Sequence, residues 1–114
     1  MKNLTGPVRD KRKAVNILRV NDESGGIVYG YAEDLSRSGM FISCLRPKKI
    51  GEEFTVSFEL PFNHRRAVYR CRVTRVRDKS ADGRHDSGMG VRFLDMDDET
   101  SRRIDAWVDG GRII

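Results

Sequence analysis

The sequence has few of the residues that build covalent or metal-based sites. It contains two cysteines and two histidines among 114 residues. Cys44 and Cys71 form no Cys-x-x-Cys pair and have no histidine nearby in sequence, so their spacing indicates neither a metal site nor a redox pair. Each lies in an apolar, strand-like segment, where a free cysteine packs as a small hydrophobic group. We therefore expect free thiols, no metal and no cofactor.

Long apolar runs and catalytic patterns are also missing. No stretch approaches the roughly 20 apolar residues of a membrane-spanning helix, and the N-terminus lacks the apolar core of a signal peptide. These absences predict a cytoplasmic protein with no membrane span. His64 and His85 lie in polar segments outside any nucleophile–base–acid pattern. The sequence therefore predicts no catalytic residues, and the protein is not expected to be an enzyme.

Positive charge is what the sequence has in excess. Lysine and arginine number 22 against 17 aspartates and glutamates, which gives a net charge of +5 and an isoelectric point near 9.6. This balance favours an anionic partner such as a nucleic acid, a nucleotide or an anionic membrane surface. A charged surface that is merely solvated gives the same balance.

Cations gather near the N-terminus, after a Gly6-Pro7 pair that interrupts regular structure. They are Arg9, Lys11, Arg12 and Lys13. We interpret residues 1–13 as a flexible basic arm and residues 14–110 as a single domain. The arm is either a solvated terminus or a segment that becomes ordered on an anionic ligand.

Short β-rich segments fill the rest of the chain. Strict alternation of apolar and polar residues over 54–60 predicts a strand with one buried face. Composition and turn residues predict the other strands, which are 14–20, 27–33, 40–44, 65–77 and 88–94. The alternation slips between Val73 and Val76, which predicts a β-bulge or a change of face.

The last segment has helical spacing. Ile104, Trp107 and Val108 fall on one face, and Gly110-Gly111 is a typical helix stop. The capping residue is expected among Asp95, Asp97 and Asp98. Trp107 is expected to pack over the end of the sheet. About six short strands and one helix predict an all-β, mainly antiparallel domain, either a small barrel or a sandwich.

The turn after the second predicted strand has an unusual composition. Asp34, Ser36, Ser38 and Gly39 place a carboxylate, two hydroxyls and a glycine within six residues. Aspartate and serine bond nearby backbone groups in turns, and glycine tolerates φ above zero. Such a turn presents N–H groups and short polar side chains to a flat polar ligand. An ordinary connection between two strands is the alternative.

Combined with a later glycine-rich strand, this turn resembles the PilZ domain family. The matching features, in order, are the basic arm, the first strand, Asp34-x-Ser36-x-x-Gly39, Gly88-x-Gly90-Val91-x-Phe93 and a terminal helix. PilZ domains are bacterial receptors for cyclic di-GMP. The resemblance implies a six-stranded antiparallel barrel with a C-terminal α-helix. It also implies cyclic di-GMP as ligand and a separate protein effector, in motility, pili, exopolysaccharide or similar processes.

The arm matches the family's ligand motif incompletely. That motif is Arg-x-x-x-Arg, just before the first strand. Arg9 and Lys13 have the spacing but end in lysine, whereas Arg9 and Arg12 have the chemistry but stand one residue too close. Counted back from the first strand, Arg12 takes the second arginine position and Val8 takes the first. A planar guanidinium fits the O6 and N7 acceptors of guanine, which a lysine cannot match with two parallel bonds. The resemblance therefore implies that Arg12 contacts the guanine edge, Arg9 stacks or meets phosphate, and Lys13 adds charge.

The turn matches the second ligand motif, Asp/Asn-x-Ser-x-x-Gly, in full. The resemblance implies that Asp34 accepts from guanine N1–H and N2–H or holds an arm arginine in place. It implies that Ser36 bonds the other base or a phosphate and that Gly39 shapes the turn. The arm is expected to clamp across the barrel when the ligand binds.

Three functions stay open at this point. The first is a cyclic di-GMP receptor that changes shape and signals to an effector. The second is a PilZ-like adaptor with weak or no nucleotide binding, favoured by the incomplete arginine motif. The third is a single-strand nucleic-acid binder using 65–77, ranked last because Tyr69 is the only aromatic among its six arginines. The expected assembly is a monomer or a homodimer.

Overall fold

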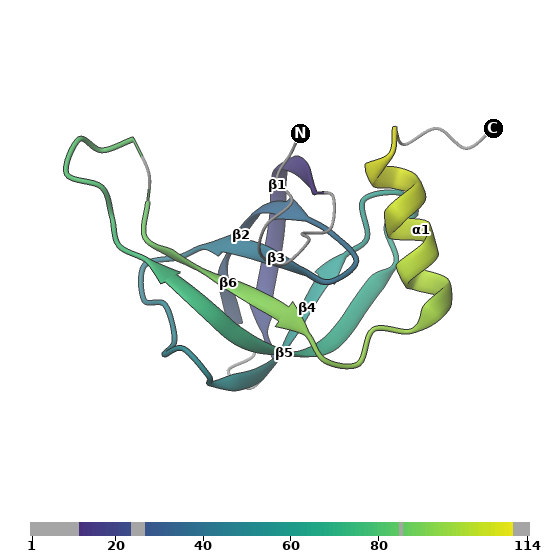
Figure 1. Ribbon diagram of the computed structural model, residues 1–114, viewed down its shortest axis with the longest axis horizontal. Coiled ribbons are helices and arrows are strands. Elements are labelled where there is room, and N and C mark those ends of the chain that lie inside the picture. Colours follow the sequence, from purple (N-terminus) through teal and green to yellow (C-terminus); the bar gives the residue numbers. More distant parts are fainter. Residues whose placement is uncertain (1–11, 24–26, 85, 111–114) are drawn as a thin grey trace, which may run out of the picture.

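The computed structural model describes residues 12–23, 27–84 and 86–110, which form a closed β-barrel and one helix (Figure 1). The strands are β1 Lys13–Asp22, β2 Ile27–Leu35, β3 Gly39–Ser43, β4 Glu53–Glu59, β5 Arg66–Arg77 and β6 Gly88–Phe93, and the helix is α1 Asp98–Val108. All pairs are antiparallel, and the order around the barrel is β1-β2-β3-β6-β5-β4. The expected antiparallel barrel with a C-terminal helix is confirmed, and the sandwich is excluded.

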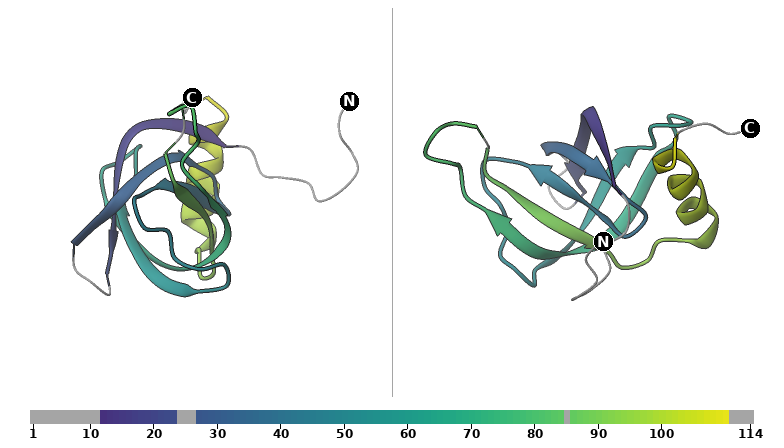
Figure 2. Two further views of the ribbon diagram at one scale, coloured as in Figure 1. Left: turned by 90° about the vertical axis from the view of Figure 1, so that its left-hand side faces the viewer. Right: turned by 45° about the horizontal axis from the view of Figure 1, so that its top comes forward.

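The barrel interior is filled by one side of each strand, as β4 illustrates. Phe54, Val56 and Phe58 are at most 5% exposed, while Glu53 and Glu59 at the two ends of the strand are exposed. Successive side chains point to opposite faces of a strand, so the apolar residues of the alternating sequence all face the barrel interior. Figure 2 shows the strands curving around this common interior.

The helix packs on one side of the barrel and is well capped at its start. Asp97 is the N-cap, and its Oδ2 accepts from the backbone N–H of Thr100 at 2.9 Å. Ile104 is fully buried, and Trp107 packs partly buried against the same core, as expected. This helix of 11 residues, the one within the described part of the chain, is too short and too polar to cross a membrane.

Most strand ends lie within two residues of their predicted positions. The slip in β5 is confirmed, because its register with β6 shifts between Val73 and Arg75. The main difference is β2, which runs on through Asp34 and Leu35, opposite Phe41 and Met40 of β3. Asp34 is therefore a strand residue at the edge of the turn.

The barrel closes through a short seam between β1 and β4. Only two residue pairs join these strands in the described chain, Asn21 with Ser57 and Asp22 with Val56. The backbone N–H of Glu23 adds a bond of 2.9 Å to the carbonyl of Thr55. By contrast, β4 and β5 pair along seven consecutive residues.

Candidate functional site

The turn between β2 and β3 is built around the hydroxyl of Ser36. The Oγ atom accepts from the backbone N–H groups of Ser38 and Gly39, both at 3.2 Å. The backbone N–H of Ser36 donates to the carbonyl of Gly39 at 2.9 Å. Ser36 is 0% exposed. We expected the Ser36 hydroxyl to contact a ligand. In this structure the hydroxyl instead lies inside the turn and holds the turn closed.

Gly39 is required by close packing rather than by a positive φ. A Cβ added there would lie 2.0 Å from the carbonyl oxygen of Val91 on β6, and Gly39 is absent from the glycines with positive φ. Gly39 therefore does not use the positive φ that a glycine tolerates. The same approach lets the N–H of Phe93 bond the carbonyl of Ser38 at 2.8 Å. Gly39 shapes the turn because its missing side chain allows the backbone of β6 to lie directly beside it.

Asp34 and Arg12 are brought together across 22 residues of sequence. The Oδ1 atom of Asp34 accepts from Arg12 Nη1 at 2.7 Å and from the backbone N–H of Phe41 at 3.1 Å. The two side chains are partly exposed, Arg12 at 37% and Asp34 at 27%. The carboxylate thus fixes the arginine that precedes β1 at the edge of the turn, the second of the two roles considered for it.

The remaining arm cations are less fully described. Lys13 is the first residue of β1 and lies opposite Leu35 in register. Arg9 and Lys11 fall outside the described residues. Arg37, inside the turn, places Nη1 3.4 Å from Asp105 Oδ2 and so links the turn to α1.

An aromatic ring covered by arginines lies beside Asp34 on the outer surface of the barrel. Phe41 is 2% exposed because the guanidinium carbons of Arg75 and Arg77 sit 5.0 and 4.3 Å from its ring centroid. A Cβ at Gly88 would come within 2.6 Å of the Phe41 ring. The glycine-rich strand therefore makes room for this ring. Sequence reasoning missed Phe41 and Arg75 as neighbours, since only the β3–β6–β5 register brings them together.

Most arginines of β5 are already paired with carboxylates. The pairs are Arg66 with Glu23 at 2.6 Å, Arg70 and Arg72 with Glu53 at 2.8 and 2.5 Å, and Arg77 with Glu33 at 2.7 Å. The hydrogen bonds from Arg72 and then Arg70 lower the pKa of Glu53 below its usual value. Bonds from Ser57 and then Arg66 do the same for the pKa of Glu23. This compensation argues against β5 as a nucleic-acid groove, which needs cations available to phosphates.

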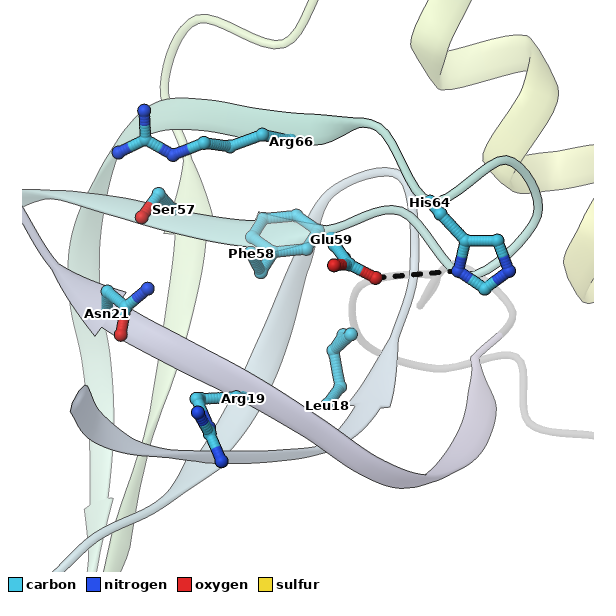
Figure 3. A pocket seen from close by; sticks show the side chains of 8 residues that line it. All are labelled: Leu18, Arg19, Asn21, Ser57, Phe58, Glu59, His64 and Arg66. Carbon is cyan, nitrogen blue, oxygen red and sulfur yellow. Dashed lines mark ion pairs between the residues drawn. The ribbon is translucent and has the colours of Figure 1, made fainter.

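Two clefts lie away from the turn. The first, of about 470 Å³, opens where β1 and β4 diverge beyond the seam (Figure 3). Its lining residues are Leu18, Arg19, Asn21, Ser57, Phe58, Glu59, His64 and Arg66. His64 and Arg66 face carboxylates there, with His64 Nδ1 3.4 Å from Glu59 Oε1. Because His64 and Arg66 are paired with carboxylates, they give this cleft no excess of positive charge to bind an anion.

The second cleft, of about 620 Å³, lies between α1 and the β4–β5 turn, where Phe62 and Trp107 line it. Neither cleft contains a residue of the turn or Arg12. The candidate site therefore lies outside both of these clefts. Within the described ranges, no group of three or more His, Cys, Asp or Glu side chains is placed to hold a metal ion.

A protein-family model matches most of this chain. The family model described as PilZ domain matches residues 8–110. No curated protein matches the sequence.

Solved structures share the fold at low identity. The inhibitor of motility MotI/DgrA from Bacillus subtilis superposes with a TM-score of 0.77 at 13% identity, covering 91% of this chain and 50% of that one. This chain thus spans about half the length of MotI/DgrA. The PilZ domain of YcgR from Escherichia coli, solved with c-di-GMP, gives a TM-score of 0.66 at 12% identity and covers 91% and 90% of the two chains.

Proposed function

Because the chain belongs to the PilZ domain family, we propose that it is a cyclic di-GMP receptor that passes the signal to a separate protein. The observation that carries the proposal is the contact between Arg12 and Asp34, which joins the two ligand motifs at one point on the surface. Support also comes from the complete Asp34-x-Ser36-x-x-Gly39 turn.

Arg12 has the chemistry to read a guanine edge. A guanidinium carries five N–H donors in a plane, and the bond to Asp34 uses Nη1. Donors therefore remain for the paired O6 and N7 acceptors of guanine. Asp34 fixes the arginine before the ligand arrives, which lowers the entropy lost on binding.

Each remaining motif residue has a part in the proposal. Arg9 and Lys13 supply further positive charge to the two phosphodiesters, and Arg9 is available to stack on a base. Ser36 and Gly39 hold the turn in shape, so that their contribution to affinity is indirect. The ligand would bring residues 1–13 across this face and present a new surface to the effector.

The test is a calorimetric titration of cyclic di-GMP into the wild type, Arg12→Ala and Asp34→Asn. Losing one bidentate contact costs about 1–3 kcal/mol, so each variant should bind roughly 5- to 150-fold more weakly. Arg19→Ala is the control, because Arg19 is an exposed arginine on β1, the strand that Arg12 precedes, and lies outside the turn. Thermal melts should show all variants folded.

The second candidate is a PilZ adaptor that acts through protein contacts with weak or no nucleotide binding. The observation that favours it is Lys13, which stands where the arm motif calls for a second arginine. The same titration separates the two functions. No heat with wild type at hundreds of micromolar ligand would reject the receptor and leave the adaptor.

A further inference from the structure

The arginines near the turn differ in whether a carboxylate neutralises them. On β5, all the outward arginines except Arg75 form the ion pairs described above. Arg92 of β6 resembles Arg75: both side chains are exposed, and neither makes an ion pair with any described carboxylate. Unlike the other four arginines of β5, these two arginines leave local positive charge available to an anion.

Strand register places both arginines beside the candidate site. Arg92 lies directly opposite Gly39, the last residue of the turn motif. Arg75 ends a row across four strands that starts at Asp34 and passes through Phe41 and Gly90. Adjacent strands are about 4.8 Å apart, so this row spans about 14 Å. A ligand with two bases and two phosphates can reach across such a face.

Arg75 is held in position without being neutralised. Its guanidinium rests over the Phe41 ring at 5.0 Å, and its Cγ and Nε lie 3.0 and 3.1 Å from where a Cβ of Gly90 would be. Arg77 covers the same ring, but it is bound to Glu33 and to the carbonyl of Asp86 at 2.8 Å. An arginine stacked on an aromatic ring keeps its N–H edge available for hydrogen bonding. Arg77 therefore supports the ring, and Arg75 keeps its guanidinium edge available for a further partner.

We infer that Arg75 and Arg92 bind the phosphodiesters of the ligand whose guanine meets Arg12 and Asp34. This inference rests on the proposed function and adds a phosphate-binding half to its site. Guanidinium groups bind phosphate oxygens through paired, charge-assisted hydrogen bonds. Arg92 lies next to the turn and takes the nearer phosphate, while Arg75 takes the farther one. In the arm motif, Lys13 stands in place of an arginine and cannot form paired hydrogen bonds with a phosphate. Arg75 and Arg92 then supply these bonds from the strands.

The experiment is a titration of cyclic di-GMP into Arg75→Gln, Arg92→Gln and the double variant at two salt concentrations. Each single variant should weaken binding about tenfold, as expected from the loss of a charge-assisted contact of roughly 1.4 kcal/mol. The double variant should also show a smaller loss of affinity between low and high salt, since fewer ion pairs form with the ligand. Arg75→Lys and Arg92→Lys, which keep the charge, should retain the salt dependence.

Arg66→Gln is the matched control, because it removes the same charge from the other end of β5, where Glu23 pairs with it. It should bind within about twofold of wild type, a change of under 0.5 kcal/mol. Unchanged affinity in both glutamine variants, with Arg12→Ala still weakened, would overturn this inference and leave the proposed function intact. Absence of binding by the wild type would overturn both.

Discussion

Gly39 marks the place where two strands come too close for any side chain. An alanine Cβ there would sit 2.0 Å from a backbone carbonyl, and backbone atoms cannot move aside as a flexible side chain can. We predict that Gly39→Ala lowers the free energy of unfolding by about 1–3 kcal/mol, the usual cost of overpacking. Urea denaturation followed by circular dichroism measures this loss.

Gly90→Ala is a suitable comparison for Gly39→Ala. The three atoms nearest to its added methyl would all belong to the Arg75 side chain, the first at 3.0 Å. That chain is exposed and can shift, so the loss of stability should be clearly smaller. Equal losses in the two variants would show that the steric argument for Gly39 is wrong.

Among the elements, α1 depends on a cap that also binds the barrel. The hydroxyl of Tyr69 on β5 donates to Asp97 Oδ1 at 2.6 Å. This bond, followed by those from Thr100, lowers the pKa of Asp97 to about 2 from its usual 3.8. A carboxylate with a lowered folded-state pKa stabilises the fold above its usual pKa, and the effect is lost as pH falls through the lower value.

We therefore predict a pH-dependent effect of Asp97→Ala. At neutral pH it should cost about 1 kcal/mol of stability, the typical value of an N-cap. The difference from wild type should shrink as pH falls from about 4 towards 2, because the wild-type carboxylate becomes protonated there. Urea unfolding at several pH values measures it. A difference that stays constant across this range would contradict the assigned pKa.

The strands and helix followed from the sequence because their signals are local. Alternation set the faces of β4, the slip near Val73 located a bulge, and Asp97 was among three expected caps. The turn motif was visible for the same reason. What the sequence did not show was pairing across the sheet. The Phe41–Arg75 contact depends on the register of β3, β6 and β5, and the complete burial of Ser36 depends on tertiary packing.

At the scale of the whole molecule, the seam between β1 and β4 is the weakest closure of the barrel. It has two residue pairs, whereas β3 and β6 share five. Local opening occurs where few backbone bonds and contacts resist it. We predict that, in hydrogen-exchange mass spectrometry, amides of the seam residues 21–22 and 56–57 exchange faster than those of β5 and β6. Equal or greater protection at the seam would refute this.

One strand connects the seam to the candidate site. β1 starts beside Arg12, at the Asp34 contact, and ends at Asn21 and Asp22, where the barrel closes. A nucleotide that prefers the closed form must, by reciprocity, make opening more costly in proportion to its occupancy. Opening of the barrel and binding of the proposed ligand would then be coupled through a single equilibrium, along the ten residues of β1.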